Sequence, residues 1–171
     1  MAIAHKSMYE TKNPHYRLLM DKLWGHSIAT AFCARLIGQL LKLGDVDVLF
    51  LMGLTHDIGK TFMLKAFSEE PTVKNLDMKL VVANIQEAHL GISNIMLKRW
   101  GFSDAFIRAV SLHEKNEFNS GVSQDCLVVN LANMTTRIIG YSVMEAAKIE
   151  PAEMRSASLL GMAPEAVVKV G

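Results

Sequence analysis

Apolar residues recur at helical spacing along almost the whole sequence, and no segment shows the alternating pattern of a half-buried β-strand. The clearest stretch runs from Pro14 to about Leu43, where Leu19, Leu23 and Ile37 belong to one apolar face. The other segments with helical patterns lie at about 3–9, 45–58, 62–67, 76–99, 103–113, 124–139, 143–148 and 151–160. The periodicity therefore predicts an all-α protein, built as a bundle of seven or eight helices.

The composition is that of one globular domain. Half of the 171 residues are apolar and a fifth are charged, which excludes a disordered chain. We expect residues 1–171 to form a single domain. The net charge is +1 and no run of Lys and Arg exceeds two residues, so nucleic acid is not an expected partner. Cys33 and Cys126 lie far apart in apolar helical patterns, which favours buried thiols over a disulfide.

No feature of the sequence points to a membrane. No apolar run reaches the roughly 18 residues that a membrane span needs. The first residues are too short an apolar stretch for a signal peptide, and His5 and Lys6 interrupt them. We expect a cytoplasmic protein without membrane contact.

Four of the six histidines lie within or at the ends of predicted core helices, and these are His26, His56, His89 and His113. Imidazole is rare in a protein core unless its ring nitrogens find partners. Four such residues therefore suggest a shared polar site.

The strongest local motif is the run from Gly53 to Lys60, Gly-Leu-Thr-His-Asp-Ile-Gly-Lys. Adjacent imidazole and carboxylate groups at a helix end can bind one divalent cation, which then activates water. Gly59 would let the backbone turn without a Cβ clash, and Lys60 could contact a phosphate oxygen. The alternative is a hydrogen-bonded pair in which the imidazole of His56 donates to Asp57 and stiffens the helix junction.

Together these motifs resemble those of HDOD domains, the signalling relatives of the HD metal-dependent phosphohydrolases. The matching runs are Trp24-Gly25-His26-Ser27, Leu54 to Lys60, Glu87-Ala88-His89 with Ser93, Leu97 and Trp100, and Ala109 to Glu114. The resemblance extends from about Met8 to Gly161 and implies an HD-domain-like helical bundle. HDOD domains normally begin with another helical portion, so we expect this chain to correspond to the C-terminal, HD-like half.

The resemblance also implies a metal site. The catalytic HD pattern assigns metal binding to His26, His56 and Asp57, and related HD-GYP proteins add histidines that match His89 and His113. The expected ion would be a divalent transition metal, namely Mn, Fe, Ni or Zn. The open alternative is that these histidines are core residues with satisfied ring nitrogens.

Two departures from the catalytic pattern bear on activity. Asn133 stands where catalytic HD proteins place their last aspartate ligand, and a neutral amide oxygen is a weaker ligand for a divalent cation. Glu114 replaces the second of a histidine pair, although a carboxylate can itself ligate. If the chain is nevertheless a hydrolase, Asp57 and Lys60 are its expected catalytic residues.

The resemblance implies a regulatory output module of the kind used by bacterial regulators. Such a module would act through contacts with a signalling protein or with an attached sensory or receiver domain, and we expect no efficient catalysis. The alternative is a metal-dependent phosphohydrolase acting on a nucleotide, a cyclic dinucleotide or a phosphomonoester. A homodimer is also open at this point.

Overall fold

The computed structural model describes residues 7–70, 77–143, 154–163 and 166, and all regular secondary structure within them is helical. The elements are η1 (Ser7–Tyr9), α2 (Pro14–Leu40), α3 (Val46–Thr55), α4 (Ile58–Glu69), α5 (Met78–Arg99), α6 (Asp104–Ser111), α7 (Gln124–Ile138) and α8 (Arg155–Leu159). The predicted all-α class is confirmed for the described residues.

The predicted helix count was too high. In the described segments six helices, α2 to α7, have eight residues or more, while η1 has three residues and α8 has five. Segments this short form few intrahelical hydrogen bonds and add little to a bundle. The helix predicted at 143–148 begins at the last residue of a described segment and otherwise lies outside the described residues.

Local sequence signals place most helix starts correctly. Asn13 caps α2 by accepting a hydrogen bond from the His15 amide, and Pro14 takes the first helical position, as predicted. Asp45 caps α3, and Ser103 caps α6 through the Phe106 amide. The start of α4 was predicted about four residues too late, because helical periodicity continues across the α3–α4 junction.

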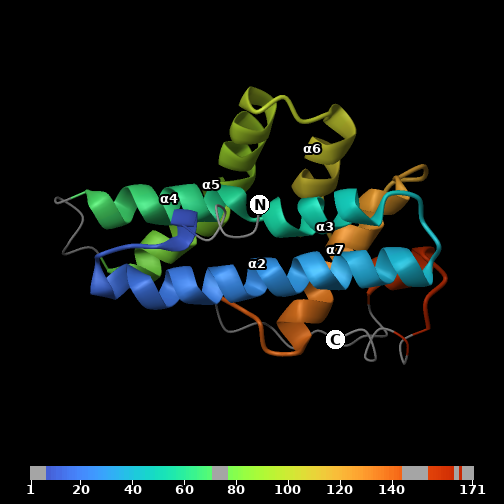
Figure 1. The fold of residues 1–171 in the computed structure, drawn as a ribbon, viewed down its shortest axis with the longest axis horizontal. Coiled ribbons are helices and arrows are strands. Elements are labelled where there is room, and N and C mark those ends of the chain that lie inside the picture. The colour runs from blue at the N-terminus through green and yellow to red at the C-terminus, as the bar shows by residue number, and fades with distance from the viewer. Residues whose placement is uncertain (1–6, 71–76, 144–153, 164–165, 167–171) are drawn as a thin grey trace.

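The longest helix organises the bundle. Figure 1 shows α2 along the long axis of the molecule, with α3 and α4 following one another beside it. The most extensive contacts of α2 are with α3 and α7, and α5 packs on α4 and α6. One core cluster lies mainly among α2, α3, α6 and α7 and includes Ile58 of α4, Leu97 of α5 and Ala157 of α8. A second cluster joins η1, α2, α4 and α5. The α3–α4 junction lies between the two.

Two glycines let helices approach each other closely at that junction. A Cβ on Gly53 would lie 2.8 Å from the carbonyl oxygen of Thr30 in α2. A Cβ on Gly59 would lie 2.1 Å from the carbonyl oxygen of His89 in α5. The predicted reason for Gly59, a backbone turn, was therefore wrong. Gly59 lies inside α4, and its missing side chain allows close packing instead.

Cys33 and Cys126 are buried free thiols, as predicted. Among the described helices, none combines the length and the hydropathy needed to cross a membrane.

Candidate metal centre

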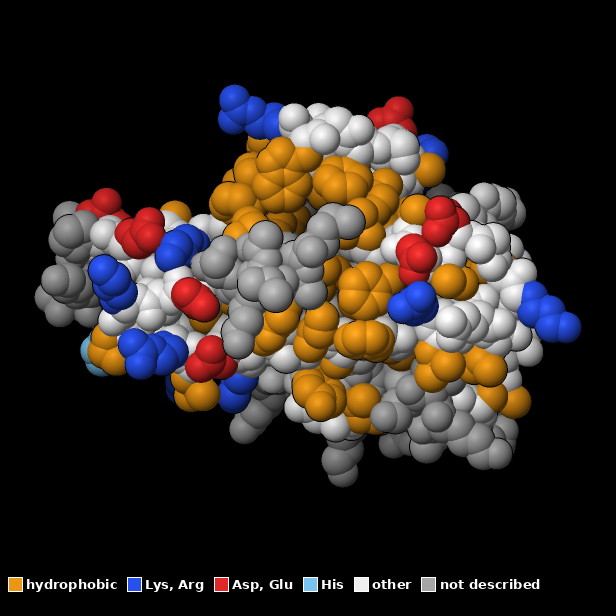
Figure 2. Space-filling view, viewed as in Figure 1, with side chains coloured by type: hydrophobic (Ala, Val, Ile, Leu, Met, Phe, Trp, Pro, Cys, Tyr) orange, Lys and Arg blue, Asp and Glu red, His pale blue; other side chains and the backbone are white. Residues whose placement is uncertain are grey.

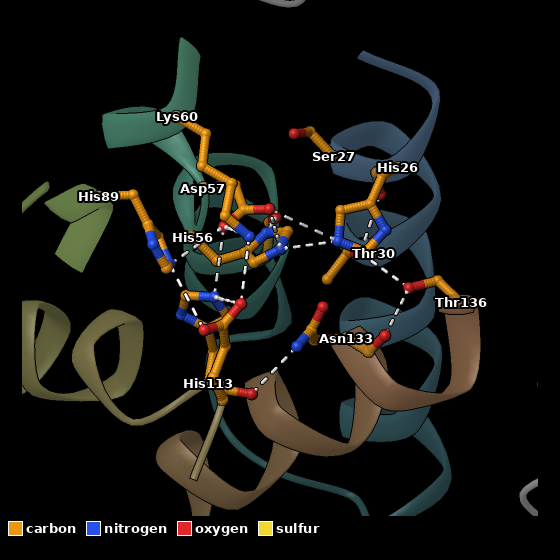
Figure 3. Close-up of polar contacts among 12 residues, drawn as sticks. His26, Ser27, Thr30, His56, Asp57, Lys60, His89, His113, Asn133 and Thr136 are labelled. Atoms are coloured by element: carbon orange, nitrogen blue, oxygen red, sulfur yellow. Dashed lines mark hydrogen bonds and ion pairs between the residues drawn. The ribbon is translucent and has the colours of Figure 1, made fainter. Parts of the chain in front are cut away.

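Four histidines from distant parts of the chain meet around Asp57 (Figure 3). His26 comes from the middle of α2, His56 and Asp57 form the α3–α4 junction, His89 lies in α5, and His113 follows α6. All five side chains are buried. The fold thus brings together the histidines that the sequence singled out.

Each of the four rings is oriented by a backbone carbonyl. The Nδ1 atom of His26 donates to the Tyr141 carbonyl at 2.7 Å. In the other three histidines Nδ1 bonds to the carbonyl three residues earlier, and these carbonyls belong to Gly53, Gln86 and Val110. A carbonyl oxygen can only accept, so Nδ1 carries the proton and the Nε2 atom of each neutral ring presents a lone pair.

All four Nε2 atoms face the carboxylate of Asp57. His26 and His56 lie 3.7 and 3.5 Å from its Oδ2, and His113 and His89 lie 3.3 and 3.7 Å from its Oδ1. The Nε2 atoms of His26 and His56 are 3.0 Å apart. Lone pairs that face each other and a carboxylate repel, so this arrangement requires a cation or an added proton.

The protonation equilibria of the buried rings disfavour the added proton. Burial lowers the pKa of His26 and moves that of His56 well below its usual range, although the nearby Asp57 acts in the opposite direction. The only proton of neutral His56 already goes to the Gly53 carbonyl. A His56–Asp57 pair in which the imidazole donates to the carboxylate therefore does not match this geometry.

A lysine and a second carboxylate complete the centre. Lys60 Nζ lies 3.0 Å from Asp57 Oδ1 and 3.1 Å from Glu114 Oε1. Burial alone would raise the pKa of Asp57, but the ammonium of Lys60 opposes burial, and that pKa lies well below its usual range. Gln86 donates to both carboxylate oxygens of Glu114, at 2.8 and 2.7 Å. The carboxylates are therefore ionised and held in place.

The potential ligands form two overlapping sets that share Asp57. The first ligand set is His26, His56 and Asp57, and the second ligand set is Asp57, His89, His113 and Glu114. Within each set the ligand atoms lie within 4.8 Å of one another. An ion at roughly 2.1 Å from each ligand would separate neighbouring ligands by about 3.0–3.4 Å, and the His26–His56 spacing of 3.0 Å lies at the lower end of this range.

Unsatisfied buried atoms show that these residues fit a metal ion. His89 Nε2 and His113 Nε2 are buried and have no hydrogen-bond partner within the described residues, whereas Asp57 Oδ1 is ion-paired with Lys60 at 3.0 Å. Such atoms are rare in folded proteins unless an ion or a ligand uses them. Imidazole and carboxylate together suit Mn, Fe, Ni or Zn, so the donor set does not select one metal.

Asn133 lies beside this cluster. Its side-chain amide donates to the His113 carbonyl at 3.1 Å. Asn130, one turn earlier in α7, donates to the carbonyls of His113 and Lys115 at 3.0 and 2.8 Å. Both residues hold the turn that carries His113 and Glu114.

Sequence reasoning missed Gln86 and the positioning role of Asn130. The spacing of Gln86, three residues before His89, is a signal that could have identified it, because it places both residues on one face of α5.

A cavity of about 590 Å³ adjoins the centre. Its lining includes Asp57, Lys60, His113 and Glu114 of the centre. Phe118 and Arg137 contribute to other parts of its wall. Its size is in the range of small-molecule sites, so a ligand could reach the centre.

Comparison with known proteins identifies the family. The profile of the HDOD domain matches residues 1–116, which is more than half of the chain. The chain belongs to the HDOD domain family. The match includes all four histidines and Asp57, but it ends before Asn133, whereas the motif resemblance extends to Gly161. No functionally curated protein matches this HDOD chain.

Three solved structures share the fold. The response regulator MmoQ from Methylococcus capsulatus (strain Bath) has a TM-score of 0.67 and 22% identity, over 88% of this chain and 60% of its own. A candidate metal-dependent phosphohydrolase from Shewanella amazonensis SB2B has a TM-score of 0.68 and 17% identity, over 99% of this chain and 65% of its own. An HDOD domain protein of unknown function from Geobacter sulfurreducens has a TM-score of 0.63 and 20% identity, over 99% of this chain and 58% of its own. The chain thus spans less than two thirds of each of these proteins, and identities this low establish the fold alone.

Proposed function

We propose that this HDOD chain is a regulatory module of signal transduction that acts through protein contacts. Its His/Asp centre binds a divalent transition metal ion without efficient hydrolysis of phosphoesters. The partner is a signalling protein or an attached sensory or receiver domain, and residues 1–171 act as one domain in the cytoplasm.

The hydrogen bond made by the Asn133 side chain supports the absence of efficient catalysis. The catalytic HD pattern would place an aspartate ligand at this position. Here the amide donates to the His113 carbonyl, which an ionised carboxylate could not do. A neutral amide oxygen also offsets less of the ion's charge than a carboxylate does. The residue supports the turn beside the centre and supplies no negative charge.

An exposed apolar stripe on α2 supports the protein-contact part of the proposal. Phe32, Leu36 and Leu40 are spaced four residues apart, and Phe32 and Leu40 are 58% and 56% exposed. The Phe32 ring packs against Phe50 of α3, with centroids 5.2 Å apart, and Val48 is also partly exposed. Figure 2 shows hydrophobic side chains at the surface over α2 and α3. Apolar patches of this kind often mark protein-interaction sites.

The second candidate function is metal-dependent phosphoester hydrolysis. It is favoured by the four histidine nitrogens that face Asp57 and by the cavity next to them. A bound divalent ion would supply Lewis-acid activation at this point. Lys60, which lines the cavity, would then offset the negative charge of a phosphate. The substrate would be a nucleotide, a cyclic dinucleotide or a phosphomonoester.

A turnover assay separates the two functions. Wild type, Asp57→Ala and Asn133→Asp are loaded with Mn²⁺ and assayed on bis-p-nitrophenyl phosphate and p-nitrophenyl phosphate. For a regulatory module, wild type shows no more turnover than Asp57→Ala. Asn133→Asp tests whether the missing carboxylate limits hydrolysis. Turnover that appears only in this variant would support the proposal. Turnover by wild type that disappears in Asp57→Ala would overturn it.

A further inference from the structure

Lys60 lies between the two carboxylates of the centre. Its ammonium is 3.0 Å from Asp57 Oδ1 and donates a hydrogen bond to Glu114 Oε1 at 3.1 Å. The side chain is only 13% exposed, so these carboxylates are its main partners. The ordinary pKa of lysine is about 10.4, and the two adjacent carboxylates favour the charged form. The ammonium is therefore charged at neutral pH.

The same two carboxylates face two histidine nitrogens that lack a partner. His89 Nε2 lies 3.7 Å from Asp57 Oδ1 and 3.7 Å from Glu114 Oε2. His113 Nε2 lies 3.3 Å from Asp57 Oδ1 and 3.7 Å from Glu114 Oε1. Neither nitrogen has a hydrogen-bond partner in the described part of the chain. These four side chains are the second ligand set, and the Lys60 ammonium forms ion pairs with both of its carboxylates.

One oxygen atom makes Lys60 and a metal ion compete. Asp57 Oδ1 lies beside Lys60 Nζ and also faces both histidines of the second ligand set. An ion bound by this oxygen would lie close to the ammonium, and like charges repel strongly in a buried site. The ammonium and a metal ion therefore exclude one another at this position.

We propose that Lys60 is the resident cation of the second ligand set and limits this HDOD centre to one metal ion per chain. The first ligand set binds that ion. The second ligand set accepts a further ion only when the Lys60 ammonium is removed or displaced. This inference rests on the metal-binding part of the proposed function and is independent of its regulatory part.

The test is the metal stoichiometry of Lys60→Met, which removes the charge and keeps an unbranched side chain. Metal-free proteins are dialysed to equilibrium against Mn²⁺, and bound manganese is counted by elemental analysis. We expect one ion per wild-type chain and two per Lys60→Met chain, a twofold increase. Because both sets share Asp57, the EPR spectrum of the variant should change from an isolated ion to a coupled pair.

Three further variants locate the effect. Lys60→Arg retains the charge and should keep the wild-type stoichiometry. Lys65→Met removes a charge from the same helix but outside the centre, since Lys65 Nζ pairs with Glu69 Oε1 at 3.2 Å. This variant should also bind one ion. Adding His89→Gln to Lys60→Met should remove the extra ion alone. An extra ion that persists in this double variant would contradict the proposed position.

The outcomes separate this inference from the proposed metal site. One ion in both wild type and Lys60→Met overturns the role of Lys60 and leaves the metal centre standing. No ion in either protein overturns both. No ion in wild type but one in Lys60→Met supports the role of Lys60 and contradicts binding by the first ligand set. If Lys60→Met folds only with Mn²⁺, the ion replaces the lost charge as proposed, whereas a variant unfolded with and without Mn²⁺ overturns the inference.

Discussion

The Nε2 atoms of His26 and His56 lie 3.0 Å apart, and neither neutral ring has a proton to place between them. The Nδ1 proton of His26 is donated to Tyr141 and that of His56 to Gly53. Two acceptors at this distance gain from a shared cation, because the cation converts a repulsion into two favourable contacts. This pair is therefore the part of the centre most dependent on a bound ion.

Metal addition should stabilise the wild-type chain. At a free Mn²⁺ or Zn²⁺ concentration 100 times the dissociation constant, we expect the free energy of unfolding to rise by about 2.7 kcal/mol. This gain corresponds to an increase in Tm of roughly 5–11 °C for a domain of this size. His26→Gln should reduce this shift, since it removes one ligand of the first ligand set. His15→Gln, which changes an exposed residue, is the control. Equal shifts in the two variants, measured by thermal unfolding with and without EDTA, would argue against binding at His26.

Gly59→Ala should destabilise the fold although it only adds a methyl group. Its Cβ would lie 2.1 Å from the His89 carbonyl oxygen, so α4 and α5 would have to move apart. We expect a loss of about 1–3 kcal/mol or more in the free energy of unfolding. Gly91 is the matched control on α5, because a Cβ at that position would meet no atom of another element within 4 Å. Gly91→Ala should stabilise by up to about 1 kcal/mol through helix propensity, and urea unfolding measures both.

Asn130→Ala should loosen the turn that carries His113 and Glu114. The Asn130 amide donates to the carbonyls of His113 and Lys115, and the substitution removes both hydrogen bonds. We expect a loss of about 1–3 kcal/mol in unfolding free energy, together with weaker metal binding. Asn84→Ala is the control, since Asn84 is exposed and donates to the Leu80 carbonyl of its own helix. Calorimetric titration with the metal should show weakened binding in Asn130→Ala alone.

The metal-free protein should lose stability as the pH falls below about 6.5, the ordinary pKa of histidine. Burial moves the pKa of His56 in the folded state well below that value, so the unfolded chain takes up a proton that the folded chain does not. Each such group contributes up to about 1.4 kcal/mol per pH unit between its folded and unfolded pKa values. Asp57, whose folded pKa is also depressed, loses its stabilising effect only at more acidic pH.

This pH dependence can be measured by urea unfolding between pH 7.5 and 5.5 in the presence of a chelator. His56→Gln should show a shallower decline than wild type, because it lacks the group that the fold keeps neutral. His15→Gln should retain the wild-type slope. A His56→Gln protein as steeply pH-dependent as wild type would place the responsible group elsewhere.

Much of the fold was predictable because its signals are local. The capping of α2 by Asn13 and Pro14 depends on neighbouring residues, and so does the apolar face that runs along that helix. The break between α3 and α4 was predicted, but three to four residues too late, because the helical periodicity continues through His56 and Asp57. The role of Gly59 was missed, since the carbonyl of His89 that it approaches is thirty residues away along the chain.

The sequence by itself determined the helical class, the family motifs and the identity of the four core histidines. Only the tertiary structure decided how these side chains are used. The carbonyl that orients His26 belongs to Tyr141, at a separation of 115 residues. Lys60 pairs with a second carboxylate besides that of Asp57, and this carboxylate belongs to Glu114, at a separation of 54 residues. Periodicity and capping reach only a few residues along a helix, whereas the direction of a lone pair and the counter-ion of a buried charge depend on which helices pack together.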